Sequence, residues 1–412
     1  MDANMEIVYE RCCGIDVHKK EIVATVITGQ HSMVTRRFGA FTHELRELAA
    51  WIKAEGCQIV AMESTGSYWK PLYNVFELEG IKAMVVNSYH ARTIPGYKTD
   101  KRDSRRLAKL LRHGLLQASF IPDKDQREFR ELTRYRVSRT EERARELNRL
   151  QKMLEGANIK LGNVVSEITG DTATRLIKLA VSNESLTEDQ IAAARDPKCK
   201  ASVEAFQNAL TGILSPLQRE LLVEVLRIID EQTRQIERIE AMIQKYASDV
   251  YDQAVKALDP IPGIGRISAE QIVAEIGVDM SQFPTAGQLC AWAGVSPGDN
   301  ESAGRRKGGK TRKGNRTLKK TLIQCATSAV NNKDSFFYAQ YQRLVVRKGR
   351  NRAIVAVAHS ILIAVYHVLS GNEFRDLGAQ YYTQFNKNKK IHSLFKQLQK
   401  LGVEIFCPVL AS

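Results

Sequence analysis

Apolar residues in the first 115 positions fall into short runs that alternate with amphipathic stretches. The stretches at 43–55 and 67–79 repeat apolar residues every three or four positions and predict helices, with Thr42 as the expected N-cap of the first. Another helix is predicted to carry Asp103. Five apolar runs predict strands, the first around Cys13–Val17 and the others at about 21–27, 33–39, 58–63 and 82–87.

Three consecutive strands followed by alternating helix and strand is the order of a ribonuclease H-like fold, whose sheet is mixed rather than purely parallel. In that fold acidic residues lie on the first strand, on the fourth strand and on a late helix. The N-terminal part of the chain is therefore expected to be an α/β domain of this kind.

Beyond residue 120 the pattern becomes helical and charged. Residues 126–154 carry eight arginines among several glutamates and predict a long polar helix, either solvated and laced by charge pairs or in contact with nucleic acid. Short helices are expected at 155–215. At 222–243 apolar residues follow steps of three and four, the seam of a coiled coil with Gln232 as its polar position. That seam is expected to close on the 126–154 helix or on another copy of the chain.

A second globular part begins near Leu258. Its Pro-Gly263-Ile-Gly265 segment has the form of a helix-hairpin-helix, whose glycines allow a tight turn and bring backbone N–H groups close to a phosphate; a plain helix turn is the alternative. The apolar run Ala353–Leu369 contains polar residues and predicts a buried helix rather than a membrane span. The expected domains are an α/β domain at 1–125, a helical coiled-coil region at 126–250 and a mainly helical domain at 251–412.

Composition narrows the function. The chain has 412 residues and a formal net charge of +15, which favours a polyanionic partner such as nucleic acid. Its seven cysteines include no Cys-x-x-Cys pair, so they fit a reducing cytoplasm better than a disulfide framework or a zinc site. The first ten residues include three acids and do not resemble a signal peptide. We therefore expect a cytoplasmic protein with no membrane partner.

Four acidic residues stand where a divalent metal site would need them. Asp16 and Glu63 lie in apolar strand-like runs, where a carboxylate without a partner is costly to bury. Asp100 and Asp103 are three apart and project from one face of a helix. Together they offer the oxygen ligands that Mg²⁺ prefers. Each alone is also explained as a strand end or a helix cap.

The most basic stretch is rich in glycine and follows the second globular part's first helices. Cations and glycines together lie against a phosphate backbone with little steric hindrance, so this stretch predicts a nucleic-acid contact. A solvated basic loop is the alternative. The cations are Arg305, Arg306, Lys307, Lys310, Arg312, Lys313 and Arg316.

Several motifs together resemble the Piv-type insertion-sequence transposases, the DEDD recombinases, some of which are guided by a bridge RNA. They are Gly-Ile-Asp16-Val-His-Lys, Glu63-Ser-Thr-Gly-Ser-Tyr-Trp, Lys-Thr-Asp100-x-x-Asp103-Ser, Ile-Pro-Gly-Ile-Gly, and Asn-Glu-Ser302-Ala-Gly-x-Arg followed by Lys-Gly-Asn. The resemblance implies a RuvC-like N-terminal domain, a coiled-coil middle and a C-terminal transposase domain. It also implies that the four acids bind Mg²⁺, that Ser302 is the nucleophile, and that the partners are donor and target DNA, a bridge RNA and further copies of the chain.

Ser302 needs help to act as a nucleophile, because a serine hydroxyl attacks only when its proton is removed and the developing charge is stabilised. The neighbouring cations Arg305, Arg306 and Lys307 are suited to the second task, and a metal to the first. The halves of the chain are expected to form one composite site. Two other functions stay open: a RuvC-like, Mg²⁺-dependent, structure-selective endonuclease that activates water, and a nucleic-acid-binding scaffold without catalysis.

Overall fold

The computed structural model describes most of the chain, which divides into two compact units, Met1–Pro122 and Asp123–Ser412. The described residues are 6–29, 32–64, 66–87, 103–183, 185–247, 249–298, 301–302, 305–306, 311–382, 391, 394 and 397–398. The second unit contains both the helical region expected at 126–250 and the region expected at 251–412.

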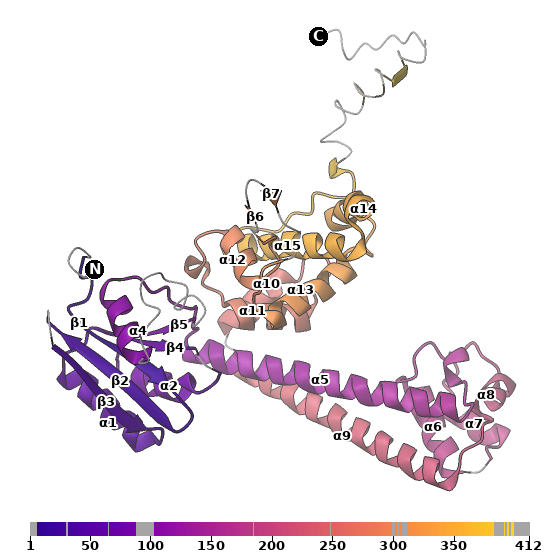
Figure 1. The fold of residues 1–412 in the computed structure, drawn as a ribbon. Helices are drawn as coiled ribbons and strands as arrows, with labels where there is room; N and C mark the ends of the chain where they lie inside the picture. Colours follow the sequence, from indigo (N-terminus) through magenta and orange to yellow (C-terminus); the bar gives the residue numbers. More distant parts are fainter. Residues whose placement is uncertain are drawn as a thin grey trace. The chain divides into compact units, whose positions relative to one another are not determined.

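A five-stranded mixed sheet forms the centre of the first unit (Figure 1). Its strand order is β3-β2-β1-β4-β5. The first three strands pair antiparallel, whereas β1 pairs parallel with β4, and β4 with β5. The strands are β1 Arg11–Val17, β2 Glu21–Thr28, β3 Ser32–Gly39, β4 Ile59–Glu63 and β5 Ala83–Val86, as the apolar runs predict.

Both faces of this sheet are covered, because alternate residues of a strand point to opposite sides. Cys13, Ile15 and Val17 of β1 pack against helices α1 (Thr42–Ala54) and α2 (Trp69–Leu78). Cys12 packs on the other side with helix α4 (Asp103–Arg112). The buried cysteines are therefore core residues, and burial raises the pKa of Cys12 to about 12.

Helix α1 begins one residue earlier than expected. Thr42 is its first helical residue, so the prediction that Thr42 is the N-cap is wrong. Phe41 occupies that position, and its backbone N–H donates to the Glu44 carboxylate at 3.0 Å. A glutamate three residues inside the helix thus accepts the backbone N–H of the N-cap residue, whose own side chain cannot cap the helix.

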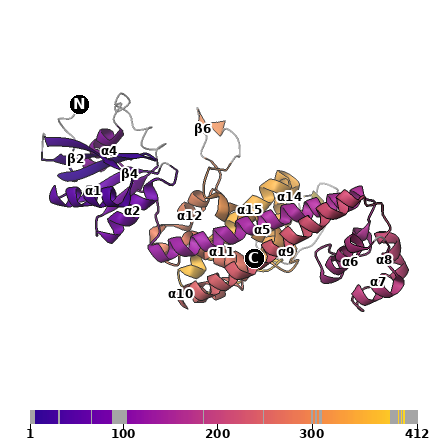
Figure 2. The same ribbon diagram turned by 90° about the horizontal axis from the view of Figure 1, so that it is seen from below.

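Two long helices dominate the start of the second unit. Helix α5 (Lys124–Gly156) and helix α9 (Pro216–Tyr246) lie side by side (Figures 1 and 2). Short helices between them close a separate core around Phe206 and Leu222. These are η1 Leu161–Asn163, α6 Asp171–Ser182, α7 Glu188–Ala194 and α8 Val203–Leu210.

The predicted seam lies on α9 and closes on α5 within the chain. Leu222, Val225, Ile229, Ile239 and Ile243 are buried along it. Between them the amide oxygen of Gln232 is buried without a hydrogen-bond partner in the described part of the chain. Sequence alone left open whether the seam meets α5 or another copy.

The rest of the second unit is a cluster of helices around α15 (Arg350–Leu369), which packs against α10, α12, α13 and α14. Ala353, Val357, Ile361 and Val365 form its buried stripe. By length and composition, α15 is the one described helix that could cross a membrane. The other elements are α10 Asp249–Leu258, α11 Arg266–Ile276, η2 Met280–Gln282, α12 Ala286–Ala293, α13 Arg316–Ala329, α14 Phe336–Lys348, β6 Glu301–Ser302 and β7 Arg305–Arg306.

Candidate acid site and basic hairpin

Asp16 and Glu63 are neighbours on the central strands of the first unit. The paired residues Ile15 and Met62 of the parallel strands β1 and β4 each immediately precede one of these acids. Ile15 and Met62 belong to the core on the α1 and α2 side, so the two carboxylates lie on the face that α4 covers. Glu63 is only 5% exposed.

Helix α4 brings Asp103 to the same end of β1. A Cβ added to Gly14 would lie 2.2 Å from the Ala108 backbone nitrogen and 2.3 Å from the Ser104 carbonyl oxygen, so only glycine lets the helix lie this close. From Ser104 the helix runs back along β1, and the carbonyl of its last residue, Arg112, accepts the Val8 backbone N–H at 2.9 Å. Asp103, the first residue of α4, therefore lies toward the carboxyl end of β1.

Hydroxyl groups fasten the first turn of α4 to the sheet. The buried Ser104 hydroxyl bonds to the Thr25 hydroxyl at 2.9 Å, and Thr25 bonds to the Thr35 hydroxyl at 3.0 Å. Arg105 donates from Nε to the same Thr35 oxygen at 3.2 Å. This chain of contacts across β2 and β3 fixes the backbone directly after Asp103.

His18 is a further residue at the carboxyl end of β1. Its Nε2 atom lies 2.9 Å from Oδ2 of Asp16, and the histidine side chain is 61% exposed. The sequence interpretation gave His18 no role, although His18 directly follows β1 and lies two residues after Asp16.

The acid quartet as a whole stays a prediction. Asp100 lies outside the described residues. Among the residues that are described, no group of three His, Cys, Asp or Glu side chains is close enough to hold a metal. The donor chemistry of Asp16, Glu63 and Asp103 nevertheless suits Mg²⁺, which prefers carboxylate oxygens.

Ser302 lies on a short β-hairpin of the second unit. Strands β6 and β7 pair antiparallel, with Ser302 opposite Arg305 and Glu301 opposite Arg306. An isolated bridge between Pro297 and Thr311 continues the ribbon toward the helices. Lys307 and Lys310 lie outside the described residues, whereas Arg312, Lys313 and Arg316 are exposed beyond the hairpin.

The far end of this ribbon is held tightly. A Cβ on Gly314 would lie 2.4 Å from the backbone nitrogen of Gly294, so the two segments touch backbone to backbone. Asn315 follows, where it donates its N–H to the Trp292 carbonyl at 3.1 Å and caps α13 through Leu318. Its Nδ2 atom also donates to Glu275 at 2.5 Å.

Glu275 joins three elements. The carboxylate, on α11, is 1% exposed and accepts a bidentate pair from Arg134 of α5 at 2.6 and 2.8 Å. Arg130 lies 3.5 Å away and also donates to backbone carbonyls of α11. Burial lowers the pKa of Arg130 to about 10, while Glu275 opposes that shift. The base of the serine hairpin is thereby tied to α5 as well as to α11.

The helix-hairpin-helix segment connects α10 to α11. Gly263 has a φ of +85°, and a Cβ there would lie 2.2 Å from the Cys325 carbonyl oxygen of α13. Packing against α13 is thus a sufficient reason for Gly263. Gly265 is the N-cap of α11, and a Cβ at this position would have open space around it. The phosphate contact expected at both glycines stays a prediction.

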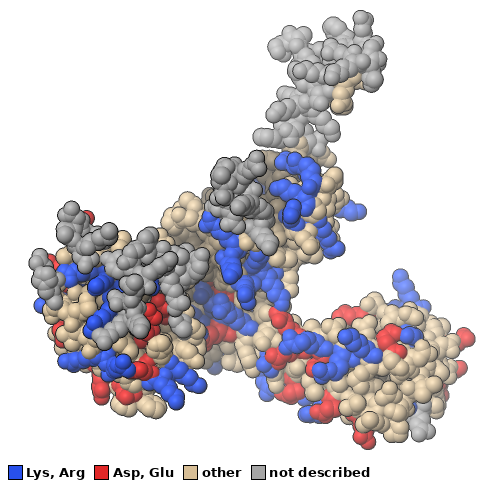
Figure 3. Space-filling model, viewed as in Figure 1, with Lys and Arg blue, Asp and Glu red and all other residues tan. Residues whose placement is uncertain are grey.

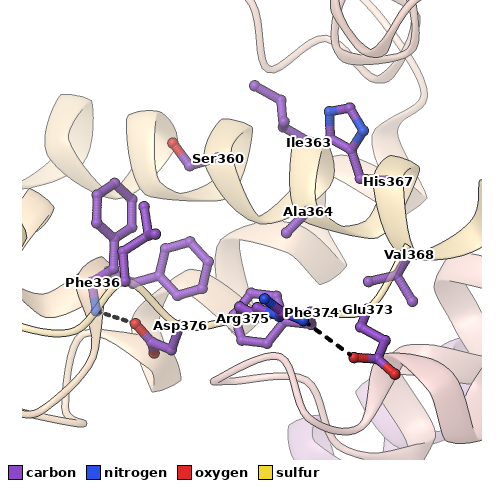
Figure 4. A pocket seen from close by; sticks show the side chains of 12 residues that line it. Phe336, Ser360, Ile363, Ala364, His367, Val368, Glu373, Phe374, Arg375 and Asp376 are labelled. Atoms are coloured by element: carbon purple, nitrogen blue, oxygen red, sulfur yellow. Dashed lines mark hydrogen bonds and ion pairs between the residues drawn. The ribbon is translucent and has the colours of Figure 1, made fainter.

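An apolar cavity of about 400 Å³ lies elsewhere in this unit, between α14, α15 and the segment after α15 (Figure 4). Phe336, Phe374 and His367 are among its lining residues. Asp376 closes one side by accepting the Phe336 backbone N–H at 2.8 Å. None of the predicted site residues lines it, so we do not assign it to the reaction.

Comparison with known proteins identifies two matching segments. Residues 13–159 match the DEDD transposase family of IS110 type, and residues 255–342 match the transposase family IS116/IS110/IS902.

Three transposases show similarity over most of their length. The transposase for insertion sequence element IS1111A of Coxiella burnetii is 23% identical over 333 residues, which cover 79% of this chain and 80% of that protein. The putative transposase y4qE of Sinorhizobium fredii is 25% identical, over 77% of this chain and 71% of its own. The putative transposase y4pF/y4sB of the same organism is 25% identical over 82% and 80%.

Proposed function

We propose that this chain, which belongs to the IS110-type DEDD transposases, moves an insertion sequence by metal-assisted strand exchange through a covalent phosphoserine link at Ser302. The observation that supports the proposal is that Asp16 and Glu63 lie near the carboxyl ends of the paired strands β1 and β4, on the face covered by α4, which begins at Asp103. The strand order β3-β2-β1-β4-β5 supports a ribonuclease H-like, RuvC-like fold for the first unit.

The acids would hold Mg²⁺, with Asp100 completing the set. A bound Mg²⁺ would act as a Lewis acid on the phosphate and on the attacking hydroxyl. Asp16 and Glu63 are suited to hold it because the parallel pairing of β1 and β4 fixes their spacing. The hydroxyl contacts of Ser104 and Thr25 fix the start of α4 and with it Asp103.

Ser302 would attack the scissile phosphorus. A bond forms between its Oγ atom and phosphorus, the bond from phosphorus to one deoxyribose oxygen breaks, and that oxygen leaves with a proton. The serine proton passes to a base, which returns it to the leaving deoxyribose oxygen. Because the phosphoserine keeps the energy of the broken phosphodiester, a DNA hydroxyl reverses the step on the new strand without an external energy source.

The remaining partners are nucleic acids and further copies of the chain. Donor and target DNA are the substrates that a transposase requires. A bridge RNA and a homo-oligomer, dimeric or tetrameric, are proposed from the resemblance, with the protein holding RNA through its backbone and shape. The formal net charge of +15 supports a nucleic-acid complex.

Covalent trapping tests the reaction. Full-length protein is incubated with Mg²⁺, the ends of the native element and its flanking RNA, and then denatured on a gel. We expect a DNA–protein adduct that Ser302→Ala abolishes and that Ser328→Ala, an exposed serine of α13, retains. Asp16→Asn, Glu63→Gln and Asp103→Asn should also lose the adduct while circular dichroism shows a folded chain.

Cleavage without an adduct would contradict the proposal. If Ser302→Ala still cuts the same phosphates and leaves free ends, the phosphoserine mechanism is wrong and a RuvC-like endonuclease replaces it. If EDTA leaves cleavage unchanged, the metal assignment of the acids is wrong.

A further inference from the structure

A second group of cations lies where α14 meets α15, beyond the segments that the family matches cover. Between Asp334 and Glu373 the chain contains five Lys or Arg residues and no Asp or Glu. Four of the five crowd one turn of the chain and are exposed. We call Arg347, Lys348, Arg350 and Arg352 the basic corner.

The geometry of this turn brings the four side chains together. Gly349 alone separates the last residue of α14 from the first residue of α15, and its φ of +74° lets the chain reverse there. Arg347 to Arg352 therefore span only a few residues on either side of one glycine. A Cβ added to Gly349 would meet no atom within 4 Å, so the corner faces open space.

In the described part of the chain, the basic corner lacks the acidic partners that other arginines have. Among the described residues, no ion pair joins any of its four side chains to a carboxylate. Arg343, one turn earlier, is instead placed over the Tyr382 ring at 4.4 Å. Figure 3 shows Lys and Arg gathered with little acid over the helices that follow α10.

Two of these cations lie at the N-terminus of α15, where a positive charge destabilises a helix. Arg350 and Arg352 lie in the first turn of α15, where the helix dipole is positive and acids are preferred. Gly349 provides no side-chain cap, and the first turn contains no acid. The first-turn backbone N–H groups and the arginines are thus both suited to an anion.

We propose that the basic corner binds the phosphate backbone of duplex DNA. The four cations and the first-turn N–H groups offer several donors to consecutive phosphates, and contacts of this kind position DNA without reading its sequence. DNA is the partner because the chain belongs to a transposase family. The inference rests on that membership and not on the role of Ser302.

Binding, rather than recombination, tests the inference. Fluorescence anisotropy with a labelled duplex measures the dissociation constant of full-length protein between roughly 50 and 300 mM salt, a range in which phosphate contacts dominate the salt dependence. The test variant replaces Arg347, Lys348, Arg350 and Arg352 by Gln. The slope of log K against log salt should fall by about 0.9 for each phosphate that the variant no longer neutralises.

A matched control removes the same charge elsewhere. Arg149, Arg227, Arg234 and Arg238 are exposed but ion-paired to Glu146, Glu224 or Glu231. Their replacement by Gln lowers the net charge equally and should leave the slope within error of the parent. An equal fall in both variants would reduce the effect to net charge and overturn the inference.

Two further outcomes also decide. An unchanged slope in the test variant, with its melting temperature retained, would show that the corner does not meet DNA. A slope lowered for an RNA duplex but not for a DNA duplex would assign the corner to RNA and overturn the proposal. Neither result depends on covalent trapping, so failure of the phosphoserine mechanism remains distinguishable.

Discussion

The arginines of α5 and those of the basic corner are both crowded in sequence but have opposite surroundings. In α5, Arg134 forms an ion pair with Glu275 of α11, and Arg136 forms one with Glu270 of the same helix. The side chains of Glu275 and Glu270 are 1% and 7% exposed. At the corner, Arg347 and Arg352 form no ion pair in the described part of the chain and are exposed. The first set holds two elements together, and the second is available to a partner.

The difference teaches that a count of arginines does not predict nucleic-acid binding. The sequence left α5 open between a helix of charge pairs and a nucleic-acid contact. The structure uses Arg130, Arg134 and Arg136 to fix α5 on α11, and Arg139 and Arg149 to pair within the helix. What matters is whether an acid lies within reach in three dimensions.

Removing the acid that these arginines share should have the largest effect. Glu275→Ala leaves the partly buried Arg130 without its carboxylate and beside the like charge of Arg134, and it removes an acceptor of Asn315 at the base of the hairpin. We expect the free energy of unfolding to fall by about 3–5 kcal/mol, measured by urea unfolding followed by circular dichroism.

An exposed pair on the same helix is the control. Glu128→Ala breaks a 3.8 Å contact to Lys124 in which both side chains are more than half exposed. It should cost less than about 1 kcal/mol. Should Glu275→Ala cost as little as Glu128→Ala, the buried network does not hold α5 in place.

The second pair sharpens the comparison through a double-mutant cycle. Arg136 and Glu270 are both buried, and Nη1 of Arg136 lies 2.5 Å from Oε2 of Glu270. Arg136→Met alone should cost about 3 kcal/mol because Glu270 is left without its main partner, although Arg266 still bonds to it at 3.0 Å.

Replacing both residues tests whether that cost belongs to the pair. Arg136→Met with Glu270→Leu should recover at least half of the stability, since no uncompensated charge then remains buried. Additive effects in the double variant would mean that each residue acts through contacts of its own.

Much of the first unit could be predicted from sequence, since its short apolar runs predict the strands. The sequence places Asp16 and Glu63 in two such runs, whereas the face that they share follows from the observed pairing and packing of β1 and β4. What fastens Asp103 could not be predicted, because Ser104 and Thr25 are 79 positions apart and meet only when α4 packs across the sheet.

The second unit was harder to predict for a related reason. The apolar seam predicted the helix α9 but not the helix that packs against it, since the same pattern suits packing on α5 and packing on a second copy of the chain. In the first unit, Thr42 was a plausible N-cap by residue type, yet the N-cap is Phe41, whose backbone N–H donates to Glu44. The four cations of the basic corner lie within six consecutive residues, but the sequence does not show whether acids lie near them in three dimensions.

The smallest change in the free energy of unfolding is expected at the basic corner. The sign of that change distinguishes the arginines of the corner from those of α5. Arg352→Glu places an acid in the first turn of α15, where the helix dipole and the first-turn N–H groups favour it. The free energy of unfolding should therefore rise by about 0.3–1 kcal/mol.

The same variant should bind duplex DNA more weakly than Arg352→Gln in the anisotropy assay, because a carboxylate repels the phosphates that a neutral amide tolerates. In α5 no such opposition exists, since Arg136→Glu would set two buried carboxylates against each other and destabilise the fold. If Arg352→Glu lowers stability as well, Arg352 supports the fold like the arginines of α5, and the distinction between the two regions fails.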